Sequence, residues 1–407
     1  MKKFLVIGLA LILGYTVSAQ EVKTQEAATQ EEATKSTLDE KIAKLETRLK
    51  KNEKRAAAWE TFRKYAKLSA FIQGQYDWVE DRDGKEHGGS STFHIRRARL
   101  ILSGDLLNGP KIGKLDYRFL FDVVRVPKNP LIEAWVRYQP IKEFGVQLGQ
   151  FIPPITFESS QSSSKYEFID FSYAISNLAK VGSNDVTGYT SSGRDAGMQI
   201  FGGFLHRDGY SIINYNIAVI NGNGINAKDD NKSKDVIGRL TIKPIKELSL
   251  ALYYQRGEAN LSKLANYAEY NWSGNAEYVT THRWGGGFAY YADKVFARGE
   301  YIAGLTGNLV SEGAYLQGGY YFSLPKNAGR IWTGAMVDYF CRNTFDYIER
   351  DNKNAHIDTR YTLCVGYRPI KFFHFQMAYS LEQRINYTFG NNRHFGNGVK
   401  FMATVIF

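Results

Sequence analysis

The last eleven residues of the sequence are Asn397-Gly-Val-Lys-Phe-Met-Ala-Thr-Val-Ile-Phe407. In an extended strand every second side chain faces the same way. One face of this strand is therefore fully apolar: Val399, Phe401, Ala403, Val405 and Phe407. The other face is mixed: Lys400, Met402, Thr404 and Ile406. When strands of this kind close into a ring, the apolar face meets lipid and the mixed face lines the interior, so a chain can cross a bilayer without an apolar helix.

The same alternation recurs from Lys67 onward. Six further stretches place apolar residues at every second position: 68–78, 117–123, 132–138, 248–254, 331–339 and 361–367. Short connections alternate with long ones along the chain. The short ones include 139–143, 243–247 and 368–372, and the long ones include 80–92, 152–193 and 258–281. This pattern predicts an all-β fold, a transmembrane antiparallel β-barrel of about 16 strands. A barrel of that size leaves an aqueous lumen.

Composition agrees with many strands joined by turns. Of 407 residues, 14% are aromatic, 38 are glycine and only 9 are proline. The formal charge of +11 indicates an anionic partner, which could be nucleic acid, anionic lipid or anionic solutes. Two cysteines are too few for a disulfide scaffold. Strand parity places Cys341 outward and Cys364 inward, so we expect neither a disulfide bridge nor a metal site.

The first 65 residues differ from the rest. Residues 1–19 have a basic start, an apolar run and a small-residue end at Ala19, which predicts a cleavable signal peptide and makes nucleic acid an unlikely partner. Residues 20–65 are interpreted as a polar periplasmic linker, disordered or loosely helical up to residue 37, followed by a short coiled-coil helix. The helix is indicated by an a/d seam at Leu38, Ile42, Leu45 and Leu49, although a solvated spacer helix fits the same pattern. Residues 66–407 form the predicted outer-membrane barrel.

The longest insert, at about 152–193, is the first candidate for a functional element. A loop of this length inside a compact fold is usually functional or disordered, and in a wide barrel it can fold inward and narrow the lumen. Arginines supply the second candidate. Parity points Arg97 and Arg99 into the lumen and Arg96 outward. It also places four more arginines inside, where lumen carboxylates could pair with them: Arg118, Arg137, Arg239 and Arg360.

The sequence gives little indication of an enzyme. The seven histidines are scattered, and no serine, histidine and acid arrangement or metal-ligand spacing is present. We expect no catalytic residues, no metal and no cofactor. A barrel that only anchors an envelope protein, and a barrel lipase, are the rival interpretations. The first predicts negligible conductance, and the second needs an outward Ser-His pair that the sequence lacks.

The chain resembles the phosphate-selective porins O and P of bacterial outer membranes from about Phe71 to Phe407. The matching segments, in order, are Phe71-Ile-Gln-Gly-Gln-Tyr76, Arg96-Arg-Ala-Arg-Leu100, Leu131-Ile-Glu-Ala-Trp135, Gly149-Gln-Phe151 with Pro153, Pro154 and Glu158, Arg194-Asp-Ala-Gly197, and Asn221-Gly-Asn-Gly224 through Lys234, Asp235 and Arg239. The resemblance implies a homotrimeric, sixteen-stranded porin in the outer membrane, in contact with lipid, with a basic lumen, an infolded third loop and passive diffusion of small anions such as phosphate or polyphosphate. It also implies that arginine and lysine side chains at the constriction bind the anion.

The sequence departs from the family pattern at four positions. Ile152 stands where the family has lysine, Ile155 where it has phenylalanine, Glu133 where it has aspartate, and Asp170 where an arginine is expected. A general, non-specific porin therefore stays open as the closest alternative. The expected anion pathway consists of Arg97 and Arg99, with Arg118, Arg137 and Arg194 as further candidates and Lys165 as the constriction cation in place of the missing lysine.

Overall fold

The computed structural model describes residues 24–80, 89–126, 129–182, 185–188, 192–260, 277–343, 356–386 and 392–407. The predicted signal peptide, residues 1–19, lies outside them. The chain divides into two compact units, Met1–Arg63 and Lys64–Phe407. Each is described below by itself.

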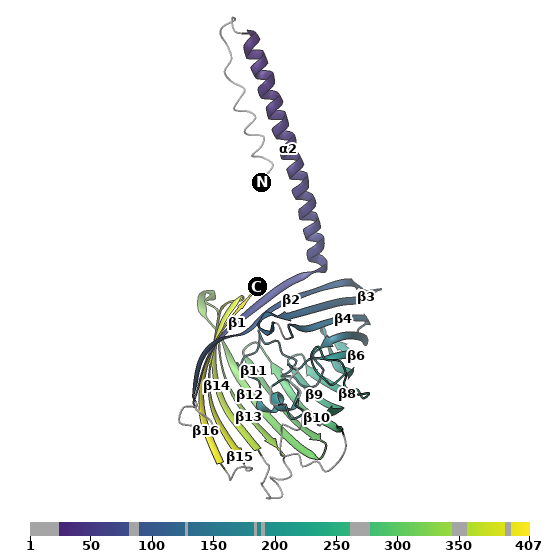
Figure 1. Ribbon diagram of the computed structural model, residues 1–407, viewed down its shortest axis with the longest axis vertical. Coiled ribbons are helices and arrows are strands. Elements are labelled where there is room, and N and C mark those ends of the chain that lie inside the picture. The colour runs from purple at the N-terminus through teal and green to yellow at the C-terminus, as the bar shows by residue number, and fades with distance from the viewer. Residues whose placement is uncertain are drawn as a thin grey trace. The chain divides into compact units, whose positions relative to one another are not determined.

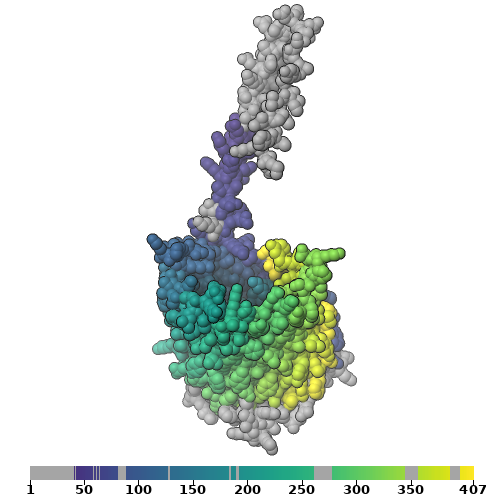
Figure 2. Space-filling model, turned by 180° about the vertical axis from the view of Figure 1, so that it is seen from behind, coloured from purple at the N-terminus to yellow at the C-terminus, as the bar shows by residue number. Residues whose placement is uncertain are grey.

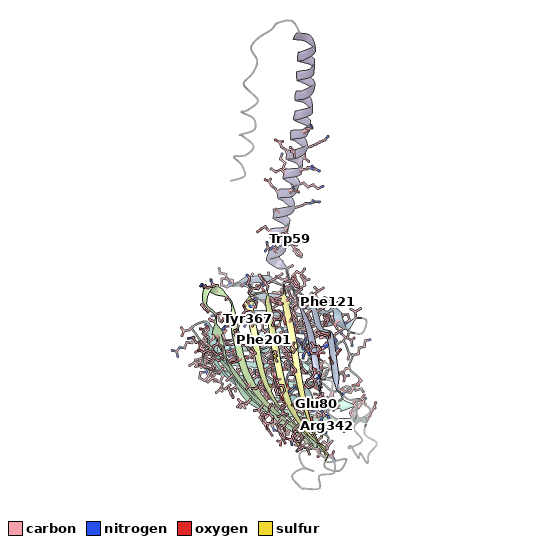
Figure 3. The ribbon with its side chains drawn as sticks, turned by 90° about the vertical axis from the view of Figure 1, so that its left-hand side faces the viewer. Trp59, Glu80, Phe121, Phe201, Arg342 and Tyr367 are labelled. Atoms are coloured by element: carbon pink, nitrogen blue, oxygen red, sulfur yellow. The ribbon has the colours of Figure 1, made fainter. Side chains whose placement is uncertain are left out.

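The described residues of the N-terminal unit form the helix α2 (Thr24–Tyr65), of 42 residues, whose last two residues belong to the second unit. The helix predicted around Leu38 to Leu49 is part of it, and so are residues 24–37, for which disorder or loose helix was expected. The helix contains no glycine or proline, and alanine, glutamate and lysine, which are strong helix formers, make up half of its 42 residues. Side chains such as Trp59 project from it (Figure 3). Within the described part of the chain, no helix has both the length and the apolar character needed to cross a membrane.

The second unit is a closed barrel of sixteen strands, which confirms the predicted fold (Figure 1). All neighbouring strands are antiparallel, and the ring closes where β1 pairs with β16, with Phe71 opposite Ile406. The strands are β1 (Lys67–Val79), β2 (Ser90–Gly109), β3 (Gly113–Asp122), β4 (Leu131–Ile141), β5 (Phe144–Phe151), β6 (Asp195–Arg207), β7 (Tyr210–Ile220), β8 (Asp235–Ile245), β9 (Leu248–Asn260), β10 (Tyr278–Tyr291), β11 (Val295–Thr306), β12 (Leu309–Ser323), β13 (Arg330–Arg342), β14 (His356–Ile370), β15 (Phe373–Asn386) and β16 (Asn392–Ile406).

The two faces of the wall have opposite character, as the alternation predicted. Along β16, Phe401 is exposed on the outside, whereas Met402 and Thr404 are buried inside. Many of the buried inward positions are polar or charged, and Arg298 and Asp338 are fully buried there. On the face shown in Figure 2 the strands form a continuous outer wall. The apolar outer band faces lipid, and the interior holds the charges.

The connections also follow the expected alternation. Tight turns join β4 to β5, β8 to β9 and β14 to β15. The connection from β5 to β6 is long and contains the short helix α3 (Tyr173–Leu178), and its described residues run inside the ring of strands (Figure 1). We call residues 152–194 the infolded segment. Two short 3-10 helices, η1 (Val123–Arg125) and η2 (Pro325–Asn327), complete the regular structure of the described residues.

Two bulges change the face of the barrel wall on which individual side chains lie. Gln73 pairs with Arg97 but Gly74 pairs with Ile95, so Arg96 is an extra residue in β2. A bulge places adjacent residues on the same face. The prediction that Arg96 points outward is therefore wrong, and Arg96 joins Arg97 inside.

The second bulge lies at the start of β4. Leu120 pairs with Glu133 while Phe121 pairs with Leu131, which leaves Ile132 as the extra residue. Ile132, expected on the lipid face, is fully buried against Leu120 and Ile225. Both cysteines are buried free thiols.

Candidate functional site

The infolded segment fills one side of the lumen. Ile155, Ile175 and Leu178 pack in an apolar cluster with inward residues of β9, β11, β12 and β13. Further along, Phe168 and Ile169 belong to a second cluster, with Trp332, Met336 and other inward residues of β11 and β13–β16. The space between the segment and these strands is closed by apolar contacts. A polar, open part of the lumen lies on the side of the segment that faces β2.

Two buried carboxylates hold the start of the segment. The backbone N–H groups of Phe157 and Glu158 donate to the Glu300 carboxylate, at 2.6 and 3.0 Å. Glu158 itself accepts from the backbone N–H of Ser172 at 3.0 Å and from its hydroxyl at 2.6 Å. The Arg298 guanidinium lies 3.8 Å from Glu158. Burial raises the pKa of Glu158, and Arg298 and Ser172 act in the opposite direction. These contacts link both ends of the turn 158–172 to the wall.

The next residues are fixed by strands β13 and β14. The Asp338 carboxylate accepts from the backbone N–H of Tyr173 at 3.0 Å, and Arg360 donates to the Phe171 carbonyl at 2.6 Å. Ser172 caps α3, since its hydroxyl accepts from the backbone N–H of Ile175 at 3.3 Å. Asp338 and Arg360 are themselves paired at 2.9 Å. One buried ion pair thus positions the helix that borders the open part of the lumen.

That open part is a cavity of about 530 Å³ between the infolded segment and the wall around β2. Seven cationic side chains line it: Arg96, Arg97, Arg99, Arg125, Arg194, Arg360 and Lys400. Three carboxylates line it as well: Asp122, Asp170 and Glu382. The lining therefore carries a formal excess of four positive charges. We call this space the basic cavity.

Several of the cations are neutralised by fixed partners. Arg99 pairs with Asp122 at 3.0 Å, and Arg194 pairs with Glu133 at 2.9 Å. Asp170 of the infolded segment pairs with both Arg96, at 2.9 Å, and Lys400.

The charge state of Asp170 follows from these partners. Burial alone would raise the pKa of this carboxyl, but Arg96 and Lys400 hold it far below its usual range. Asp170 is therefore ionised, and one carboxylate is shared by two cations.

Two arginines have only neutral partners. Arg97 donates to the side-chain oxygen of Gln73 at 2.9 Å, and Arg125 donates to the Ser192 hydroxyl at 2.9 Å. Across the residues that the structure describes, neither has a carboxylate oxygen within 4.0 Å. A guanidinium group is permanently charged and offers forked donors that match oxoanions. Arg97 and Arg125 are thus the side chains in the basic cavity with charge left for a solute.

The structure brings together three of the six predicted site residues, because Arg97, Arg99 and Arg194 all line the basic cavity. Arg118 lies beside them, with its Nε 3.1 Å from Glu133, the carboxylate that also pairs with Arg194. Arg137 is held elsewhere on the wall by Asp116.

Lys165 is also placed elsewhere. It lines a separate cavity of about 410 Å³ with Arg330, Arg368, Lys371 and Glu167.

Sequence reasoning missed four contributors to the basic cavity. Arg96 is turned inward by the bulge, and Arg125 belongs to η1, outside the alternating pattern. Lys400 was assigned to the mixed face of the last strand, and Arg360 to the lumen, but neither was chosen as a site residue. Parity alone could have selected these two, since both are inward cations on strands next to the infolded segment.

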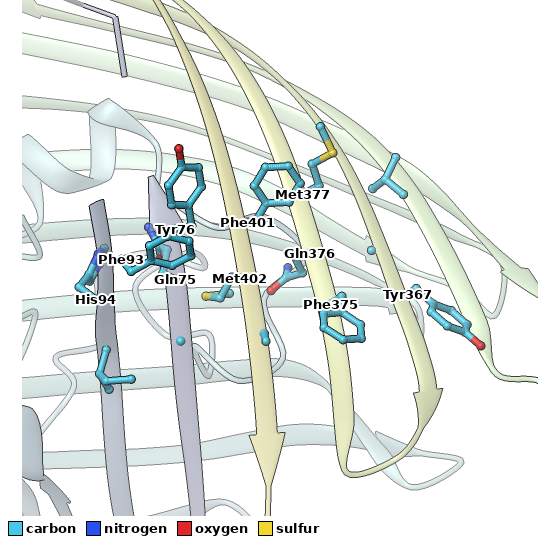
Figure 4. Close-up of a pocket in the computed structure, with 15 residues that line it drawn as sticks. Gln75, Tyr76, Phe93, His94, Tyr367, Phe375, Gln376, Met377, Phe401 and Met402 are labelled. Atoms are coloured by element: carbon cyan, nitrogen blue, oxygen red, sulfur yellow. The ribbon is translucent and has the colours of Figure 1, made fainter. Parts of the chain in front are cut away.

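A larger cavity, of about 770 Å³, lies on the outside of the barrel across β1, β2 and β14–β16 (Figure 4). Its walls are aromatic and aliphatic, with Tyr76, Phe93, Phe375 and Phe401 among them. Phe93 is 83% exposed on this outer face. The groove belongs to the lipid-facing surface and offers no charged side chain to an anionic solute.

Comparison with known proteins decides the family. Residues 66–391 match the family model "Phosphate-selective porin O and P", which is more than half of the chain. The chain belongs to the phosphate-selective porin O and P family. Members of this family are outer-membrane porins, which are channels and not enzymes. No curated protein matches the chain.

Solved structures share the fold at low sequence identity. The outer-membrane channel DcaP of Acinetobacter baumannii aligns with a TM-score of 0.57 and 13% identity, over 84% of this chain and 97% of its own. An anion-selective porin from Comamonas acidovorans aligns with a TM-score of 0.56 and 10% identity, over 84% and 99%. OmpT of Vibrio cholerae, described in its trimer form, gives 0.56 and 9%, over 84% and 99%. These alignments show that the barrel is porin-like.

Proposed function

We propose that this porin is a passive pathway for small anions, with phosphate among the solutes that it admits. The observation that supports this most directly is the pair Arg97 and Arg125, two guanidinium groups without carboxylate partners in a cavity with a formal excess of four positive charges. A confined wall of one sign raises the local concentration of the opposite ion. Anions would therefore enter this cavity more readily than cations.

The remaining lining favours passage over tight binding. Each of Arg99, Arg194 and Arg360 already has a fixed carboxylate partner. Conduction requires attraction that is strong enough for entry and weak enough for release. Two free guanidinium groups among paired ones meet that requirement for a singly or doubly charged oxoanion.

Asp170 supports a second candidate, a general porin with only a modest anion preference. Its carboxylate stands where the family pattern has an arginine, and it is shared by Arg96 and Lys400. Without it, both cations would be available to a solute. We therefore expect the pore to bind phosphate more weakly than a pore that has arginine at this position.

We also propose that the porin is a homotrimer in the membrane. Support comes from the family resemblance and from the porin-like neighbour that is described as a trimer.

The test is the single-channel current of the purified protein in a planar bilayer under a KCl gradient, followed by titration with phosphate. Anion-selective current that phosphate reduces would support the phosphate pathway. Anion-selective current without reduction would leave a general anion-preferring porin. Cation-selective current, or no current from folded protein, would contradict the proposal.

A further inference from the structure

The helix α2 carries a charge pattern that the barrel's function does not use. Its apolar seam defines a heptad register over residues 38–60, with Leu38, Leu45, Asn52 and Trp59 at position d and Ile42, Leu49 and Ala56 at position a. In this register every e position is acidic: Asp39, Glu46, Glu53 and Glu60. Three successive g positions are basic: Lys41, Arg48 and Arg55. Positions e and g flank the seam, where they face a neighbouring helix in a coiled coil.

The spacing of these charges is wrong for pairing within one helix. Each basic g residue precedes an acidic e residue by five positions, as in Lys41 and Glu46. Within a helix, side chains meet at spacings of three and four, whereas five positions bring them to opposite sides of the seam. Between two parallel helices in register, a g residue of one helix faces the e residue five positions later in the other. All three basic g residues have an acidic residue at that position.

The described apolar side chains of this face are exposed to solvent. Leu45, Leu49 and Trp59 are about 60% exposed, at 61%, 63% and 60%. In the part of the chain that is described, none of the three g cations or their e counterparts forms an ion pair within 4.0 Å. Most helical stability in proteins comes from packing of an apolar face, so covering this leucine seam would stabilise the helix.

We propose that the α2 helices of neighbouring copies of this chain associate as a parallel, in-register coiled coil. The occupant of the seam is a second copy, because the e and g charges are complementary to themselves. An antiparallel pair would place e against e and g against g, so that acidic residues face acidic ones. Asn52 is the one polar side chain among the d positions, and a single polar core residue fixes register.

The arrangement is compatible with a membrane assembly. Copies of one barrel cross the membrane in the same orientation, and each α2 ends two residues before its own β1 begins. Cyclic symmetry about an axis through the membrane makes such helices run in the same direction along that axis. The coiled coil would then be a second contact between the copies, in addition to any contact between their barrels.

The first test is site-specific cross-linking of the full-length protein in detergent. Asn52→Cys places a thiol at a d position, where parallel helices in register bring equivalent residues together. Thr47→Cys, at position f on the outer face, is the matched control. The natural cysteines are buried. Under mild oxidation we expect an interchain disulfide from Asn52→Cys and none from Thr47→Cys. Equal cross-linking of the two variants, or none from Asn52→Cys in folded protein, would overturn the proposal.

The second test reverses the charges in the Asn52→Cys background. Converting Lys41, Arg48 and Arg55 to glutamate makes both flanks acidic and should reduce the disulfide at least tenfold. Adding the changes of Glu46, Glu53 and Glu60 to lysine should restore it. The control converts Lys50, Lys51 and Lys54, at positions b, c and f, to glutamate. It changes the net charge by the same amount as the change of Lys41, Arg48 and Arg55, and should leave cross-linking intact. A loss in this control, or no rescue, would refute the e and g pairing. Bilayer current, measured on the same variants, reports the anion pathway separately.

Discussion

Replacing Arg97 by glutamine removes one positive charge from the basic cavity without leaving a buried carboxylate unpaired. The only partner of Arg97 in the described structure is the neutral side chain of Gln73. Two unit charges about 6 Å apart in a water-filled passage interact with about 0.7 kcal/mol. The loss of this charge should raise the barrier for an anion and lower that for a cation by this amount. The total of about 1.4 kcal/mol corresponds to roughly a tenfold fall in the anion-to-cation permeability ratio.

The assay is the reversal potential of single channels under a gradient of KCl near 0.1 M, where screening is moderate because the Debye length is about 10 Å. Arg207→Gln is the matched control, because Arg207 is an exposed arginine at the turn between β6 and β7. We expect a large shift towards cation permeability for Arg97→Gln and little for Arg207→Gln. An unchanged reversal potential in Arg97→Gln, or equal shifts in both, would refute the reasoning.

Three further predictions concern the infolded segment. Asp170→Asn frees Arg96 and Lys400, so the reversal potential should move towards anions and phosphate should reduce the current at lower concentration; a move towards cations would contradict this. The difference in reversal potential between Asp170→Asn and wild type should persist from pH 7 to pH 4. The reason is that the folded pKa of Asp170 lies far below its usual range, so this carboxyl stays ionised until the pH falls through that depressed pKa. Equal reversal potentials of the two proteins at pH 4 would contradict this. Glu158→Gln leaves the buried Arg298 without its carboxylate and should destabilise the infolded segment by about 3 kcal/mol. The expected readouts are a lower urea midpoint of unfolding and a noisier current. An unchanged midpoint would show that this pair does not hold the segment.

The fold could be predicted largely from side-chain alternation. Residues such as Leu250 and Leu252 face outward and Ala251 and Tyr253 inward as their positions in the sequence predicted. This works because a barrel strand has lipid on one face, and every outward position is under the same constraint.

The errors lie where the strands are irregular. A bulge adds one residue to a strand and so reverses which face the following side chains occupy. Nothing in the residues around Arg96 or Ile132 marks either bulge. Their orientation depends on the partner strand, which the alternation of a single strand does not reveal.

The site could be predicted only in part for a different reason. The arginines of β2 were identified from the chain, but the identity of the free ones depends on pairing between distant segments. Asp170 reaches Lys400 across 230 positions of sequence, and Arg125 meets Ser192 across 67. The position of the infolded segment also decides which lumen cations stay accessible. Lys165, chosen because it lies in that segment, faces a different cavity.

If solutes pass through a positively charged space beside Arg97, a thiol placed there should react faster with anionic than with cationic reagents. Ser176 lines the basic cavity from α3, and Ser176→Cys is a small change. We would measure the rates at which a negatively charged and a positively charged methanethiosulfonate reagent alter the current through this variant, relative to their rates with a free thiol in solution. We expect the anionic reagent to react at least tenfold faster than the cationic one after this normalisation, and its attachment to change the current. Equal normalised rates, faster reaction of the cationic reagent, or modification without any change in current would contradict it.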